Sequence, residues 1–164
     1  ERVFLCGGYN AGSLMLRIRP DADGRLVPEK VFQLPHTVFG AHQQTPILYE
    51  DRIYGVRQDG RLTCLSLDGK ALWASDGQYK FGMGPYLIAD GMILVLDDDG
   101  TLTMVEATPS RFHPLARTEV LTGHEAWGPM ALVEGRLILR DLKQMACVAL
   151  GSDSTDEEAE EQTE

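Results

Sequence analysis

The sequence lacks several features that would point to a common functional class. It has no run of eighteen apolar residues, so no apolar segment is long enough to span a membrane as a helix. Its cysteines, Cys6, Cys64 and Cys147, form no Cys-x-x-Cys pair, which argues against metal or disulfide chemistry and favours small, buried apolar side chains in strands. Basic residues are not clustered, which argues against nucleic acid as a partner.

Acidic residues outnumber basic ones by 25 to 15, but the excess is concentrated at one end. The last fourteen residues, 151–164, read GSDSTDEEAEEQTE and contain seven acids and no base. Like charges with no apolar residues to bury predict a solvated, disordered tail. Residues 1–150 are nearly balanced in charge, and their apolar content is typical of one folded domain.

Helical periodicity is also missing. No segment keeps apolar residues at i, i+3 and i+4 for three turns; short runs rich in Val, Ile, Leu and Tyr alternate with Gly, Asp and Pro instead. Asp-Gly pairs at 59–60, 68–69, 90–91 and 99–100 supply the positive φ angles that two-residue hairpins need. The sequence therefore predicts an all-β fold.

The short runs repeat as a group. Segments 45–67, 84–107 and 128–150 each contain a proline, an apolar strand, a tight turn with an acid, a second strand, another turn and a third strand. Their prolines, Pro46, Pro85 and Pro129, are 39 and 44 residues apart. A fourth strand is expected at 26–34, 70–75 and 115–121. A period near 40 residues with about four strands per unit is the signature of β-propeller blades.

The predicted strands do not complete a ring. Residues 2–34 fit the second to fourth strands of a unit, two full units follow, and the last unit has three strands before the acidic tail. This makes about fourteen strands, or three and a half to four blades. An open arc would expose apolar faces at both ends, and the chain begins at Glu1 in a strand-like run. We therefore expect the C-terminal part of a larger ring of about seven or eight blades, with the missing blades of the same protein as a partner.

The repeat resembles that of the pyrroloquinoline-quinone-like, or quinoprotein-type, β-propellers, over residues 2–150. The second unit matches that pattern at Pro46, Ile53, Tyr54, Gly60, Leu62, Leu65, Asp68, Gly69, Lys70 and Trp73. The third unit departs from it after Leu102, and the fourth stops after its third strand. The resemblance implies that Trp73 packs against the neighbouring blade, and it implies a periplasmic or secreted location.

Two functions are compatible with this resemblance, because the family includes dehydrogenases, outer-membrane assembly scaffolds and uncharacterised members. The first is a noncatalytic propeller that binds a protein or another ligand. The second is part of a dehydrogenase for alcohols or sugars that uses pyrroloquinoline quinone and calcium. The family's enzymes hold calcium with Glu, Asn and Asp and use an aspartate base. Asp97, Asp98 and Asp99 are contiguous and fit a hairpin turn better than a calcium loop, although absent blades could supply ligands.

The remaining candidate residues precede the first strands, which line the central channel of a propeller. One mouth of the ring is expected to bring together His42, Gln43, Gln44, Lys80, Met83, His124 and Trp127. The alternative is that these are ordinary loop residues with satisfied hydrogen bonds. No Ser/His/Asp order, phosphate-binding glycine loop or zinc spacing occurs, so no catalytic, cofactor-binding or metal residue is assigned. The sequence favours a noncatalytic binding propeller.

Overall fold

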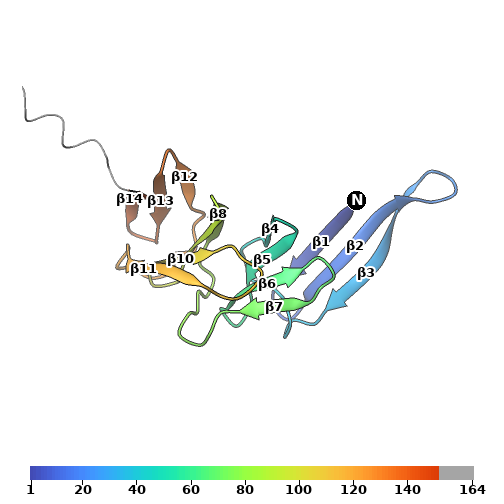
Figure 1. Ribbon diagram of the computed structural model, residues 1–164, viewed down its shortest axis with the longest axis horizontal. Coiled ribbons are helices and arrows are strands. Elements are labelled where there is room, and N and C mark those ends of the chain that lie inside the picture. The colour runs from blue at the N-terminus through green and yellow to red at the C-terminus, as the bar shows by residue number, and fades with distance from the viewer. Residues whose placement is uncertain (152–164) are drawn as a thin grey trace, which may run out of the picture.

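The protein is all-β, and the predicted fold class is confirmed. Its structure, a computed structural model, describes residues 1–151, so the predicted tail at 151–164 lies, except for Gly151, outside the described residues. Within residues 1–151 there are fourteen strands and no helix, and hence no helix long and apolar enough to cross a membrane. The strands form four antiparallel sheets, A to D, in chain order (Figure 1).

The number of strands in each sheet follows the sequence prediction. Sheet A contains β1 (Arg2–Gly7), β2 (Gly12–Pro20) and β3 (Leu26–Leu34). Sheet B contains β4 (Ile47–Tyr49), β5 (Arg52–Val56), β6 (Leu62–Ser66) and β7 (Ala71–Ala74). Sheet C contains β8 (Tyr86–Ala89), β9 (Met92–Leu96), β10 (Thr101–Glu106) and β11 (Pro114–Glu119). Sheet D contains β12 (Ala131–Val133), β13 (Arg136–Arg140) and β14 (Met145–Ala149).

The tight two-residue hairpins join the first and second strands of sheets B, C and D. Their turns are Glu50-Asp51, Asp90-Gly91 and Glu134-Gly135, in which both residues have a positive φ. The Asp-Gly pairs at 59–60, 68–69 and 99–100 lie instead in longer turns where only the glycine has a positive φ. The prediction of two-residue hairpins is thus right for 90–91 and wrong for these three, because a longer turn needs a positive φ only at its glycine.

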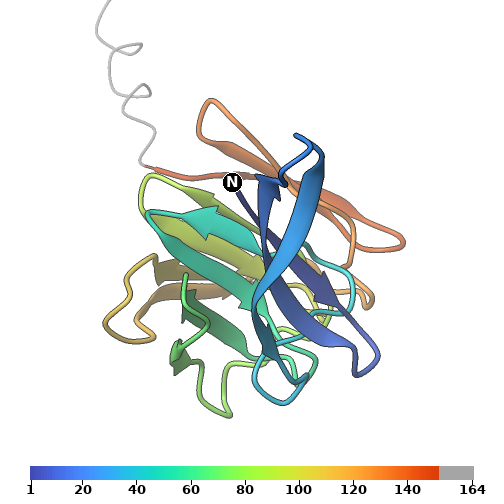
Figure 2. The ribbon, with the colours of Figure 1, turned by 90° about the vertical axis from the view of Figure 1, so that its right-hand side faces the viewer.

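Consecutive sheets pack face to face and form an open arc. Sheet A lies at one end and sheet D at the other, and the view from the sheet A end shows the later sheets behind it (Figures 1 and 2). Three apolar clusters fill the interfaces: one around Phe39 between A and B, one around Tyr54 between B and C, and one around Leu94 between C and D. Burial of apolar surface between neighbouring sheets is therefore the main stabilising contribution.

The faces at the two ends of the arc have no such partner among residues 1–151. Val3 and Leu5 alternate along β1 with Phe4 and Cys6, which pack toward sheet B, so Val3 and Leu5 lie on the opposite face of sheet A. Ile93 and Val95 lie on the corresponding face of sheet C, where sheet B covers them. Ile93 and Val95 have 0% exposure, whereas Val3 is 40% and Leu5 is 47% exposed. Residues that neighbouring sheets cover elsewhere are therefore open to solvent on sheet A.

Sheet D, at the other end of the arc, also has an uncovered face, and one prediction about its residues is wrong for that reason. Cys147 pairs with Ile138 as Cys64 pairs with Tyr54, but Cys147 is exposed whereas Cys64 is fully buried. The expected burial of Cys147 is wrong because no further sheet covers this face within the described chain. Cys64 behaves as expected, and burial raises its pKa to about 11.

Candidate functional site

Three loops enter the first strands of sheets B, C and D from the same side, and each is anchored by a buried apolar residue. Phe39, Phe81 and Leu121 fill these anchor positions and have at most 2% exposure. A glycine follows each anchor, directly at positions 40 and 82 and after one residue at position 123. A Cβ at Gly82 would overlap the Asp98 carboxylate, and one at Gly123 would overlap the Asp141 carboxylate. Glycine therefore allows each loop to pack directly on a turn of its own sheet.

The Gln44 side chain connects these loops. Its amide Nε2 donates to the carbonyl oxygens of Met83 and Trp127, at 3.2 Å in each case. Gln44, Met83 and Trp127 were three of the seven predicted mouth residues, and they meet across sheets B, C and D. We call this arrangement the Gln44 clasp. It positions the loops relative to one another and so makes a preformed surface.

Asp98 is a second connection that the sequence analysis did not assign. Its Oδ1 accepts a hydrogen bond from the backbone N–H of Met83 and another from the indole Nε1 of Trp127, both at 2.8 Å. The sequence pattern predicts a hairpin turn at Asp97 to Asp99, and these residues do lie between β9 and β10. Contact with Trp127, 29 residues away, depends on how sheets C and D pack. No local pattern predicts it.

These three carboxylates do not converge on one point. Asp97 accepts from the backbone of Asp99 and Thr101, Asp98 binds Met83 and Trp127, and Asp99 pairs with the Nδ1 of His124 at 2.8 Å. Within residues 1–151, no three His, Cys, Asp or Glu side chains are grouped so that they could hold a metal ion. The three carboxylates of this turn therefore do not act as one set of ligands.

The other predicted mouth residues line separate hollows around the clasp. His42 packs edge-on against Tyr9 at 5.0 Å between ring centroids, and Gln43 is exposed beside it. Lys80 lies with Asp98 and Asp99 around a hollow of about 370 Å³. His124 is exposed and pairs with Asp99. The structure thus brings Gln44, Met83 and Trp127 into contact and distributes the remaining four around them.

A groove lies between sheets A and B. Its volume is about 700 Å³, within the usual range for ligand sites. Apolar side chains line most of it, including Phe4, Met15 and Ile53, with Arg2 at one end and residues 42–46 at the other. Cys6 also lines it and accepts a hydrogen bond from the N–H of Ala41; burial raises the pKa of this thiol. No sequence pattern indicates this groove, because it forms between two sheets.

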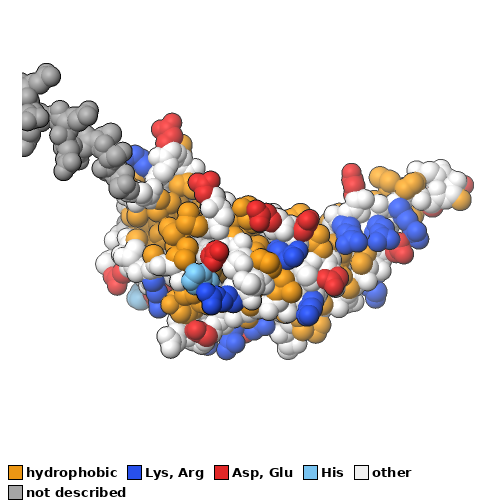
Figure 3. All heavy atoms as spheres, viewed as in Figure 1, with side chains coloured by type: hydrophobic (Ala, Val, Ile, Leu, Met, Phe, Trp, Pro, Cys, Tyr) orange, Lys and Arg blue, Asp and Glu red, His pale blue; other side chains and the backbone are white. Residues whose placement is uncertain are grey.

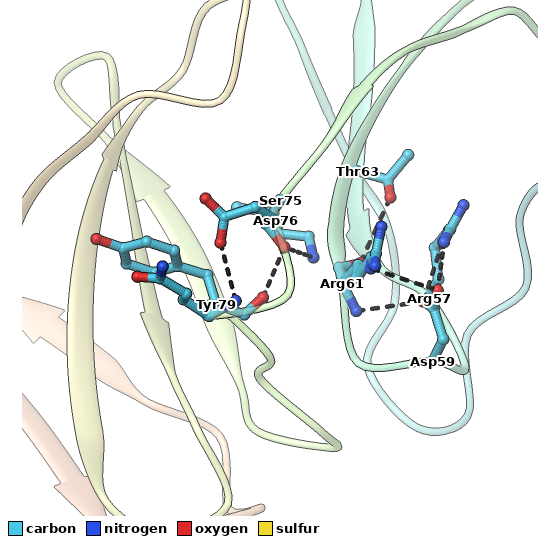
Figure 4. A network of polar contacts seen from close by, with 9 residues as sticks. Arg57, Asp59, Arg61, Thr63, Ser75, Asp76 and Tyr79 are labelled. Carbon is cyan, nitrogen blue, oxygen red and sulfur yellow. Dashed lines mark hydrogen bonds and ion pairs between the residues drawn. The ribbon is translucent and has the colours of Figure 1, made fainter.

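A polar network supports the loop between sheets B and C. The buried Ser75 hydroxyl donates to the carbonyl of Tyr79 at 2.7 Å and accepts from the N–H of Leu62 (Figure 4). Arg57 donates two hydrogen bonds to Asp59. Partial burial of Asp59 opposes its ionisation, but the Arg57 guanidinium outweighs this effect and holds the pKa of Asp59 below its usual range. The network fixes the loop that carries Lys80 and Met83.

Trp73 lies between sheets B and C. Its indole N–H donates to the carbonyl of Thr108 at 2.7 Å, and its ring contacts Tyr54 and Phe112 at centroid distances of 6.0 and 5.8 Å. Thr108 and Phe112 belong to the irregular segment between β10 and β11. The residue therefore connects one sheet to an insertion in the next.

Asp141 is expected to make the stability of the protein depend on acid pH. It is 3% exposed and accepts from the backbone N–H groups of Lys143 and Gln144 at 2.6 and 2.7 Å. These hydrogen bonds lower the pKa of Asp141 below its ordinary value. Its stabilising contribution is therefore complete above pH about 4 and is lost as the pH falls through the lowered pKa.

Asp141→Asn removes this titration but keeps an acceptor oxygen. Urea unfolding between neutral pH and strongly acidic pH should show the difference between wild type and Asp141→Asn shrinking below pH about 4. Asp90→Asn, at an exposed turn position, is the control and should retain the wild-type pH profile. A constant difference for Asp141→Asn across this window would contradict the role of the carboxylate.

Comparison with known proteins shows similarity in structure alone. No protein-family model matches the chain, and no curated protein matches its sequence. BamB from Moraxella catarrhalis superposes with a TM-score of 0.58 and 16% identity, over 88% of this chain and 40% of that one. The computationally designed Ika4 protein superposes with a TM-score of 0.58 and 11% identity, over 84% of this chain and 86% of that one.

The fold is that of β-propeller blades. The quinohemoprotein alcohol dehydrogenase from Comamonas testosteroni is a weaker match, with a TM-score of 0.46 and 15% identity over 62% of this chain and 17% of that one. This likeness carries no argument about activity. The chain spans 40% of the length of BamB, so the activity and partners of that whole protein are not transferred to this chain.

Proposed function

We propose that this chain is a noncatalytic β-propeller scaffold that binds a protein or small-molecule ligand at the mouth formed by its three loops. The Gln44 clasp is the observation that carries the proposal. A loop surface already fixed by hydrogen bonds across three sheets loses little conformational entropy on binding, which favours recognition. The proposal includes a periplasmic or secreted location and further blades of the same protein as neighbours, as the family resemblance implies.

Exposed side chains around the clasp supply the contacts for recognition. Gln43, Lys80 and His124 are exposed, and they surround Met83 and Trp127, which are partly buried. Such a surface combines an apolar centre with donors and charges of both signs, as binding sites commonly do. The divergent carboxylates of Asp97, Asp98 and Asp99 offer no arrangement for metal-assisted chemistry, which favours binding over catalysis.

Site-specific photo-cross-linking tests the location of binding. A benzophenone amino acid is placed at Gln43, Lys80 or His124 and, as a control, at Asp90 or Glu134 in the hairpins at the far ends of the inner strands. Irradiation of the producing cells is expected to give an adduct of one discrete mass at the first three positions and none at the two controls. Adducts at the controls alone, or equally at all five positions, would contradict the proposal.

A titration tests the noncatalytic part. Pyrroloquinoline quinone is added with calcium to the full chain, and tryptophan fluorescence and dye reduction with simple alcohols and sugars are followed. Neither a saturable fluorescence change nor dye reduction is expected. Calcium-dependent, saturable binding of the quinone would support the dehydrogenase alternative and overturn the proposal.

A further inference from the structure

Three polar hollows of similar size follow one another along the side of the arc where the loops enter sheets B, C and D. The A–B hollow lies between the loop 35–46 and the turn 57–60 of sheet B. The B–C hollow lies between the loop 75–85 and the turns of sheets B and C, and the C–D hollow lies between the loop 120–130 and the turn of sheet D. Their volumes are about 430, 370 and 460 Å³ in this order. The blade repeat thus places one hollow beside each sheet from B to D.

Neighbouring hollows are connected by shared or paired residues. Gln58 and Asp59 line both the A–B and the B–C hollow. Asp99 lines the B–C hollow, His124 lines the C–D hollow, and these two side chains pair at 2.8 Å. The Gln44 clasp joins the loops of the three sheets, so it holds the hollows at a fixed spacing. A ligand that contacts all three must be elongated, and a surface fixed in advance lowers the entropy cost of binding it.

Carboxylates outnumber bases in the B–C hollow. Its charged lining residues are Asp59, Asp97, Asp98, Asp99 and Lys80. Arg57 offsets the charge of Asp59 (Figure 4), and Arg117 offsets that of Asp97 at 3.7 Å. Asp98 and Asp99 then face the single ammonium of Lys80, and a carboxylate can accept more hydrogen bonds than either makes within residues 1–151. The B–C hollow therefore favours a basic side chain.

The accessible charge in the C–D hollow has the opposite sign. Lys143 is exposed and forms no ion pair with the part of the chain that the structure describes. Asp141 also lines this hollow, but it is 3% exposed and its carboxylate accepts from the backbone N–H groups of Lys143 and Gln144. The C–D hollow therefore favours an acidic side chain.

The A–B hollow has no comparable excess of charge. Asp59 is its one carboxylate and is bound by Arg57. His36, Thr37 and His42 provide hydrogen-bonding groups around it. The A–B hollow therefore favours an uncharged polar side chain.

We propose that the mouth binds an extended polypeptide segment that lies along the three hollows, with a basic side chain in the B–C hollow and an acidic side chain in the C–D hollow. The inference rests on the proposed binding function and names its partner class. Charges of both signs in a fixed order along an elongated molecule are a property of polypeptides, whereas a nucleic acid carries only negative backbone charge. Complementary charges at two separate hollows fix the direction and register of such a segment. Acidic and basic side chains are also interspersed over sheets B, C and D on the face that Figure 3 shows.

Selection from a phage-displayed library of random linear peptides on the immobilised full chain supplies the probe. Enriched peptides are expected to share a basic and an acidic residue in one order and at one spacing. A labelled member should bind saturably by fluorescence anisotropy. With a benzophenone amino acid at Lys80 or Thr122, which line the B–C and C–D hollows, the adducts should lie next to the basic and the acidic peptide residue, respectively. Enriched peptides without this order, or both adducts at the same peptide residue, would overturn the inference.

Charge-reversed variants test the two hollows separately. Asp99→Lys and Lys143→Glu should each weaken binding of the labelled peptide about tenfold or more. Glu134→Lys and Lys30→Glu reverse the same charges at exposed positions outside the hollows and should leave binding unchanged. All four should melt as wild type does. Equal effects of the hollow variants and their controls would contradict the assignment.

A peptide whose basic residue is replaced by an acid supplies a readout that a loss of structure would not give. It should bind Asp99→Lys more tightly than it binds the wild-type chain, and failure of this rescue would refute the B–C hollow as the site of the basic residue. Mouth adducts in cells, together with selected peptides that bind wild type, Asp99→Lys and Lys143→Glu equally, would refute this inference and leave the proposed function standing. Absence of mouth adducts in cells would refute both.

Discussion

Replacing Trp73 with alanine is expected to lower the free energy of unfolding by about 3–5 kcal/mol, the usual cost of removing a large aromatic side chain from a packed cluster, although the indole is only partly buried. The indole packs between Tyr54 and Phe112 and donates to the carbonyl of Thr108, so truncation opens a cavity between sheets B and C and leaves that carbonyl without its partner. A decrease in melting temperature of roughly 10 °C or more should accompany the loss. Chemical denaturation of the full chain measures it directly.

Trp73→Phe is the matched control. It keeps most of the ring contacts and removes the hydrogen bond to Thr108, so it should cost about 0.5–1.5 kcal/mol. A wild-type melting temperature for Trp73→Ala would show that the indole does not hold the two sheets together.

Leu139→Ala should destabilise the protein by about 2–5 kcal/mol, whereas Leu5→Ala should cost less than about 1 kcal/mol. Leu139 lies on the face of β13 that packs toward sheet C, and Leu5 lies on the corresponding face of β1, opposite the face of Phe4 and Cys6 that packs toward sheet B. Leu139 is 1% exposed because sheet C covers it, and Leu5 is 47% exposed because no described sheet does. Urea unfolding of the two variants therefore compares one side chain in two environments.

The comparison also reports on what covers sheet A in solution. If Leu5→Ala proved as costly as Leu139→Ala, the face of sheet A would be buried by another molecule, and the unfolding midpoint would then depend on protein concentration. A midpoint independent of concentration, with the small effect expected here, agrees with an uncovered face.

The β-sheet architecture was predictable because it depends on local patterns. Repeated prolines, apolar runs and acid-containing turns mark each strand pair, and the observed strand β3 matches the predicted range 26–34. The hairpin at Asp90-Gly91 follows from the φ angles that these two residues accept. Local conformational preference and the repeat were sufficient to predict how many strands each sheet has.

The contacts that define the site were less predictable, because they join residues distant in sequence. Loop positions alone indicated that Gln44, Met83 and Trp127 would lie near one another. Asp98 was interpreted as a turn residue, and its link to Trp127 appears once sheets C and D are packed together. Burial of Cys147 was predicted from its similarity to Cys64, but burial depends on a neighbouring sheet, and sheet D ends the described arc.

The apolar clusters join the four sheets one after another, so the stability of each sheet depends on the sheets next to it. Each cluster joins two consecutive sheets, so sheets B and C are each stabilised by two interfaces and sheets A and D by one. In such an array the stability of each unit is set by its nearest neighbours, and local opening starts at the ends and moves inward. The two hydrogen bonds of the Gln44 clasp join loops of sheets B, C and D, so local opening of sheet A should leave these two bonds in place.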